Sequence, residues 1–186
     1  RFMHNLPLRN GKGSVYEGGI RVPLMVKWSG KVAPNTRVNT PVICEDLFPT
    51  ILGMAGVKNY DVVQEVDGKS LVNLVTKGSK LAAKAAKKGV ITDQKSANAF
   101  VVPEEVSGID PERELIFHYP HQWKPYDLED IDFLSAVRVG DWKLVYRMRT
   151  AKVELYNLKD DIGEQKDVAA QYPEKVKELA EKLSAK

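Results

Sequence analysis

The sequence has little cysteine: Cys44 is the only one in 186 residues. A single cysteine cannot form an internal disulfide, so a small disulfide-stapled fold is excluded. Long apolar runs are also missing, which excludes a membrane-spanning helix, and the chain does not open on a secretory signal pattern. Charge of one sign is not in excess, since 28 Lys and Arg face 25 Asp and Glu, and nucleic acid is therefore not expected as a partner.

The composition nevertheless allows a real hydrophobic core. With 43% apolar residues, the chain suits one domain or two small ones. Its most distinctive segment is a glycine-rich loop in which Gly11 and Gly13 flank Lys12. Glycine lets the backbone approach a ligand closely, so this loop can present a cation to an anion. A solvated surface turn is the alternative, while a P-loop is excluded because Lys12 is followed by glycine rather than Ser or Thr.

The first half of the chain predicts an α/β arrangement over residues 1–88. Apolar runs predict strands at residues 23–28 and 40–44. A helix should follow, with Asp46 at its N-cap and Gly56 as its stop. Capping explains Asp46 better than metal ligation does. Strands that alternate with helices are typical of the α/β class.

A run of lysines among alanines follows, at Lys80, Lys84, Lys87 and Lys88. This composition predicts a basic helix. It could serve as a patch for an acidic polysaccharide or a membrane surface, but a solvated helix is the favoured interpretation, because little apolar area would anchor it. Residues 89–111 show weak periodicity and contain two prolines, so we expect a linker or insertion there.

From Glu112 the apolar pattern changes to a period of two, which predicts antiparallel strands. The pair Gly140-Asp141 suits a type II′ hairpin, and a helix is expected from Pro173. Residues 112–186 therefore predict a small α+β subdomain with three or four antiparallel strands and a C-terminal helix. Arg138, Asp141 and Lys143 are expected to be surface charges of the hairpin.

Several motifs together resemble the sulfatase family. The segment NLPLRNGKGSVYEGGIRVPLMVKW resembles the lysine-loop segment of sulfatases. The motifs TPVICEDLFPTILGMAGV, VDGKSL, ELIFHYPH, SAVRVGDWKLVY and ELYNLKDD follow in the family's order, and only residues 79–110 lie outside the match. The resemblance implies that residues 1–88 are the end of the sulfatase catalytic sheet and that 112–186 are its C-terminal subdomain.

The resemblance also implies roles for individual residues. Lys12 would contact the sulfate group of the substrate and would be the catalytic residue of this chain. His118 and His121 lie where similar sulfatases place the mouth of the pocket, so both are candidates for substrate binding, with ordinary packing at the strand end as the alternative. Two histidines are too few for a zinc site, and no metal ligand is predicted in the chain. Glu17 and Arg21, four residues apart, are expected to form an ion pair that supports the loop.

The activity implied for the parent protein is hydrolysis of aryl or carbohydrate sulfates by a formylglycine nucleophile with calcium. Cys44 does not fit the formylglycine motif Cys/Ser-x-Pro/Ala-x-Arg, because Glu45, Asp46 and Leu47 follow it. We therefore expect the nucleophile and the calcium ligands upstream of this chain, in a missing N-terminal part with which the chain would associate. The fragment alone is expected to be inactive, and its parent to be periplasmic or secreted.

Two other interpretations stay open at this point. One is a phosphodiesterase or phosphonate hydrolase of the same superfamily, whose deciding residues would also lie upstream. The other is a binding module without catalysis. His4, close to the start, is expected to be an ordinary surface histidine.

Overall fold

The computed structural model describes residues 5–93, 95–96, 100–103, 106, 108–122 and 130–185, so the prediction for His4 falls outside the described residues. The chain divides into two compact units. The helical unit comprises Leu24–Pro111, and the sheet unit comprises Arg1–Pro23 together with Glu112–Lys186. The domain boundaries inferred from the sequence stay a prediction.

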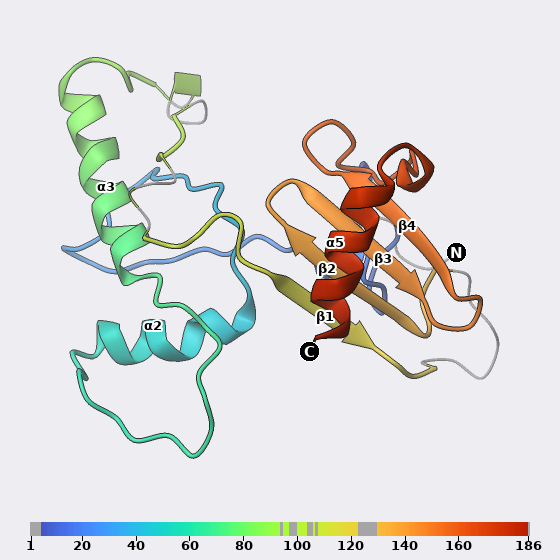
Figure 1. Ribbon diagram of the computed structural model, residues 1–186. Helices are drawn as coiled ribbons and strands as arrows, with labels where there is room; N and C mark the ends of the chain where they lie inside the picture. The colour runs from blue at the N-terminus through green and yellow to red at the C-terminus, as the bar shows by residue number, and fades with distance from the viewer. Residues whose placement is uncertain are drawn as a thin grey trace. The chain divides into compact units, whose positions relative to one another are not determined.

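The sheet unit is built on one antiparallel sheet (Figure 1). Its strands follow the order β1 (Leu115–Tyr119), β2 (Leu134–Val139), β3 (Trp142–Arg147) and β4 (Lys152–Asn157). Val139 pairs with Trp142 across the Gly140-Asp141 turn, and Gly140 has a φ of 56°. A positive φ at the first turn residue alone is the signature of a type II′ turn, so the predicted hairpin is confirmed.

Helix α5 (Pro173–Ser184) covers one face of this sheet, as Figure 1 shows. Leu179 of the helix is fully buried against Val137 and Leu144 of the central strands. Proline at its first position loses no hydrogen bond, because the first amides of a helix have no intrahelical partner. The 3₁₀ turn Ala169–Gln171 precedes the helix. The predicted α/β class, with its antiparallel sheet and C-terminal helix, is confirmed.

The opposite face of the sheet is covered by the N-terminal segment. Val15 and Tyr16 pack there against Ala136 and Val145, which alternate with the residues that face α5. The short helix α1 (Glu17–Ile20) follows directly. The segment that carries Lys12 is thus part of the second layer of the sheet unit.

The helical unit contains the 3₁₀ turn Cys44–Asp46, helix α2 (Leu47–Met54) and helix α3 (Val72–Lys87). Helix α2 ends in a Schellman motif at Gly56, whose φ is 79°, so the predicted stop is confirmed. Asp46 occupies the N-cap position, but its carboxylate accepts hydrogen bonds from the backbone amides of Ile43 (3.0 Å) and Lys69 (2.7 Å) instead of capping α2. Its side chain thus joins two loops.

Two of the local expectations are wrong. Residues 23–28 and 40–44 are not strands, and in the described part of the chain no neighbouring strand pairs with them. A strand needs a hydrogen-bonded partner, and an apolar run does not provide one. The predicted basic helix is present as α3, which begins at Val72, before the first lysine of the run.

Candidate functional site

Lys12 lies exposed at the tip of a loop whose neighbouring residues Gly11 and Ser14 are buried. The chain turns twice here through the left-handed region, at Asn10 (φ 63°) and at Gly13 (φ 88°). The Asn10 side chain stabilises the first turn by accepting a hydrogen bond of 3.0 Å from the Gly11 amide. The lysine therefore projects from a closed, internally bonded loop.

Two glycines of α1 allow this loop to close. A Cβ atom at Gly18 would overlap the carbonyl oxygens of Arg9 and Asn10, and one at Gly19 would overlap the carbonyl oxygen of Ser14. The Gly18 amide donates a hydrogen bond of 2.9 Å to the Arg9 carbonyl. The Gly18-Gly19 pair is thus required by close backbone packing at the base of the lysine loop.

Arg9 attaches the loop to the sheet unit. Its guanidinium donates hydrogen bonds of 2.7 Å to Asp130 and to the Tyr156 hydroxyl, and it lies 3.9 Å above the ring of Tyr16. The carbonyl of Asp130 accepts a further hydrogen bond of 2.7 Å from the Ser14 hydroxyl. Both sides of the loop are therefore held by the same group of residues.

A buried carboxylate, Glu154 of β4, lies beneath this group. It accepts hydrogen bonds from the hydroxyls of Tyr16 (2.5 Å) and Tyr156 (2.9 Å) and from Arg147 (2.7 Å). Burial by itself would raise the pKa of Glu154, but the hydrogen bonds from Tyr16, Arg147 and Tyr156 outweigh it and lower this pKa to about 2. Glu154 is therefore ionised wherever the protein is folded at ordinary pH.

The stability of the sheet unit should consequently fall in acid. The pKa of Glu154 lies below its ordinary value of 4.5, so the unfolded chain binds the proton more tightly than the folded one. The ionised carboxylate should contribute about 3 kcal/mol above pH 4.5, and this contribution should be lost as the pH falls through 2. Urea unfolding followed at the β3 and β4 amide resonances should show this slope in the wild type and not in Glu154→Gln. The exposed control Glu174→Gln should keep it, and an unchanged slope in Glu154→Gln would contradict the assignment.

A second buried cluster lies under α1, and it corrects one prediction. Lys143 is fully buried, not a surface charge of the hairpin, and its ammonium lies 3.0 Å from Glu17 and 2.8 Å from Glu164. Arg138 is also largely covered and lies 3.7 Å from Glu17. The reason is the alternation of β3: Lys143 shares the face of Val145, and the N-terminal segment covers that face.

The predicted ion pair between Glu17 and Arg21 is present, with 3.4 Å between the charged groups. Glu17 is buried while Arg21 is half exposed, so Lys143 is the better-shielded partner of this carboxylate. The Glu17 amide also donates a hydrogen bond of 2.7 Å to Glu164. The supporting role of Glu17 and Arg21 stays a prediction, and no local sequence signal marks Lys143 and Glu164 as further members of the cluster.

The two candidate histidines are placed differently. His118 lies in register with Ser135, and its Nδ1 is 2.5 Å from the Ser135 hydroxyl. Ser135 shares the face of β2 that α5 covers, so His118 lies on the opposite side of the sheet from the lysine loop. His121 follows the strand, and its ring lies 4.0 Å from the ring of Tyr119, which packs on the loop side. Substrate binding by either histidine stays a prediction.

Within the ranges that the structure describes, no group of three or more His, Cys, Asp or Glu could hold a metal ion. These residues therefore do not fit a calcium site. The exposed Cys44 thiol lies 3.3 Å from the Glu45 carboxylate, a hydrogen bond that raises the pKa of the thiol. A raised pKa disfavours the thiolate, so Cys44 is not activated as a nucleophile.

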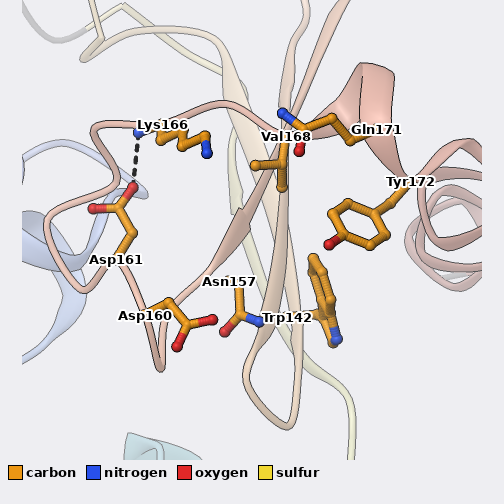
Figure 2. Close-up of a pocket in the computed structure, with 8 residues that line it drawn as sticks. All are labelled: Trp142, Asn157, Asp160, Asp161, Lys166, Val168, Gln171 and Tyr172. Carbon is orange, nitrogen blue, oxygen red and sulfur yellow. Dashed lines mark hydrogen bonds between the residues drawn. The ribbon is translucent and has the colours of Figure 1, made fainter.

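A separate pocket of about 160 Å³ lies in the sheet unit (Figure 2). The rings of Trp142 and Tyr172 meet there edge to face, with centroids 5.0 Å apart, and the Lys166 amide donates a hydrogen bond of 2.7 Å to Asp161. Trp142 lies on the face that α5 covers. None of the site residues predicted from the sequence lines this pocket.

The chain is similar to known sulfatases along its whole length. A sulfatase of Formosa agariphila is 33% identical over 98% of this chain and 29% of that protein's own length. An N-acetylgalactosamine-6-O-sulfatase of Bacteroides thetaiotaomicron is 27% identical over 95% of the chain and 29% of that protein. The solved structure of Ps i-CgsB matches with a TM-score of 0.64 and 22% identity, over 98% of this chain and 32% of that one.

The Formosa relative places the chain in the sulfatase family, and the chain spans less than a third of the length of these relatives. Residues 10–132 match the family described as "N-sulphoglucosamine sulphohydrolase, C-terminal". The chain belongs to this family. Of the helices that the structure describes, none has the length and apolarity to cross a membrane.

Proposed function

We propose that this chain is the part of a sulfatase that supplies a fixed cation to the sulfate group of a sulfated carbohydrate. The observation that carries this proposal is the position of Lys12, exposed at the tip of a loop whose flanks are buried and bonded to a sheet. A cation that is already held where negative charge develops need not move during the reaction, so no free energy is spent on reorganising the site. The resemblance to sulfatases in this segment supports the same role.

The chemistry would be cleavage of a sulfate ester by attack on sulfur. Calcium and a formylglycine, both expected in the part of the parent protein outside this chain, would supply positive charge and the nucleophile. Lys12 would bind and orient the sulfate oxygens. Arg9, Glu17, Lys143 and the residues bonded to them would keep the loop in one conformation, which favours a productive geometry.

The names of the relatives support a carbohydrate as the substrate. One relative is an N-acetylgalactosamine-6-O-sulfatase, and a second solved structure of Ps i-CgsB, with a TM-score of 0.62, holds k-i-k-neocarrahexaose. His121 is the candidate histidine on the same side of the sheet as the loop, so it is the better candidate for a substrate contact. We place the parent protein in the periplasm or outside the cell.

The proposal is tested by comparing sulfate esters with phosphate esters of the same alcohol or phenol. The full-length protein should hydrolyse N-acetylgalactosamine 6-sulfate or 4-nitrophenyl sulfate with a higher kcat/KM than the matching phosphate esters, and the present chain alone should hydrolyse neither. Preference for the phosphate ester would establish a phosphoryl hydrolase instead. Absence of turnover on both esters by the full-length protein would establish a binding module.

A further inference from the structure

Helix α3 of the helical unit, green in Figure 1, carries a continuous basic surface. Five lysines that are all exposed make up this α3 lysine surface: Lys77, Lys80, Lys84, Lys87 and Lys88. At 3.6 residues per turn their positions fall within an arc of about 100° around the helix axis. They therefore form one stripe along the helix.

The other side of α3 fixes the direction in which this stripe points. Gly78 is buried, and a Cβ atom there would lie 3.1 Å from the Val102 side chain. The Ser79 hydroxyl, also buried, accepts a hydrogen bond from the Ala33 amide, and Leu74 packs with Ile109. Because the small and apolar residues of α3 are used inside the unit, the lysines are held outward.

Repulsion between the lysines of α3 lowers the stability of this helix. Lys80 lies three residues after Lys77 and four before Lys84, which are the spacings at which like charges repel on a helix. The sequence of α3 contains no Asp or Glu, and no ion pair involves these lysines in the part of the chain that the structure describes. The helix dipole stabilises Lys84 and Lys87, because they lie in the last turn, but it does not stabilise the lysines before them.

Helix α5 has the charge pattern that is usual for an exposed amphipathic helix. It is also amphipathic and exposed, but its charges are mixed, and Lys175 pairs with Glu178 at 2.5 Å. The single sign of charge on α3 is therefore a local feature. It lies mainly in residues 79–110, the stretch outside the motifs that resemble sulfatases.

We propose that the α3 lysine surface binds a sulfated polysaccharide through sulfate groups other than the one that is hydrolysed, an inference that rests on the proposed function. A row of ammonium groups is complementary to a chain with repeated sulfates. A membrane surface is a poorer partner, because no large apolar residue of α3 is exposed. Single-stranded nucleic acid is a poorer partner too, because the stripe has no aromatic side chain for base stacking.

The test is salt-dependent binding of the full-length protein to chondroitin 6-sulfate and to the same polysaccharide after chemical desulfation. The triple variant Lys77→Gln, Lys80→Gln, Lys84→Gln should weaken binding at least about tenfold and lower the slope of log K against log salt by about two. Glutamine has nearly the helix propensity of lysine, so α3 should remain folded by circular dichroism. The control Lys58→Gln, Lys159→Gln, Lys177→Gln removes the same charge from exposed sites elsewhere and should bind like the wild type.

Four results would overturn the inference: unchanged binding in the α3 variant, an equal loss in the control variant, equal affinity for the desulfated polysaccharide, or tighter binding to DNA through the same lysines. The measurement reads binding alone, so it is independent of turnover. Lys12→Ala should still bind the polysaccharide. A protein that binds through α3 but hydrolyses no sulfate ester would refute the proposed function, while the binding of sulfated polysaccharide by α3 would still be shown.

Discussion

Replacing Lys12 by alanine in the full-length protein should lower kcat/KM for a sulfate ester by about 10²–10³. The loss should arise because the site would lack one fixed positive charge where the sulfate oxygens are stabilised. Most of the effect should appear in kcat, since the charge matters more as the transition state develops than in the bound ground state. The measurement is steady-state kinetics on one sulfate ester with both proteins at equal concentration of folded enzyme.

The same substitution should leave stability almost unchanged. The Lys12 side chain is exposed, and truncation of an exposed side chain usually changes the free energy of unfolding by no more than about 0.5 kcal/mol. Lys159, another exposed turn lysine, is the matched control, and Lys159→Ala should keep full turnover. Full activity in Lys12→Ala, or an equal loss in both variants, would show that Lys12 does not act in the catalytic site.

The parts of the fold that could be predicted from the sequence are those with local signals. The Gly140-Asp141 hairpin, the proline-led helix α5 and the glycine stop of α2 each depend on residues within a few positions of one another. The two strands predicted at residues 23–28 and 40–44 were wrong because a strand also requires a partner, which the sequence of one segment does not specify.

In the candidate site, too, features set by adjacent residues were predictable and features set by distant residues were not. The loop that presents Lys12 was predictable, because its glycines are adjacent to the lysine. The burial of Lys143 was not, because the covering residue Glu17 is 126 positions away in the sequence. The alternation of β3 did separate Lys143 from Leu144, but the sequence alone does not show which of two faces is covered, or by what.

Replacing Lys143 by methionine should destabilise the sheet unit by about 3–5 kcal/mol, which is typical when one partner of a buried charge cluster is removed. Glu17 and Glu164 would then be buried without the ammonium that lies 3.0 Å and 2.8 Å from them. Burial already raises the pKa of Glu164, with Lys143 opposing this shift, so its loss should raise the pKa further and favour uptake of a proton. Hydrogen exchange of the β2 and β3 amides measures the effect in this unit by itself.

A second variant separates lost charge compensation from lost shape. Lys143→Met combined with Glu17→Gln and Glu164→Gln removes these three charges, leaves the partly exposed Arg138 of the cluster charged, and keeps the side chains close in size, so it should recover most of the lost stability. If the triple variant is as unstable as Lys143→Met, packing rather than charge dominates at this position. If it is stable but shows the reduced turnover of Lys12→Ala in the full-length enzyme, the ion cluster holds the lysine loop in its working conformation, because Lys12 itself would be intact. Stability and turnover both at the wild-type level would show that the loop does not depend on the cluster.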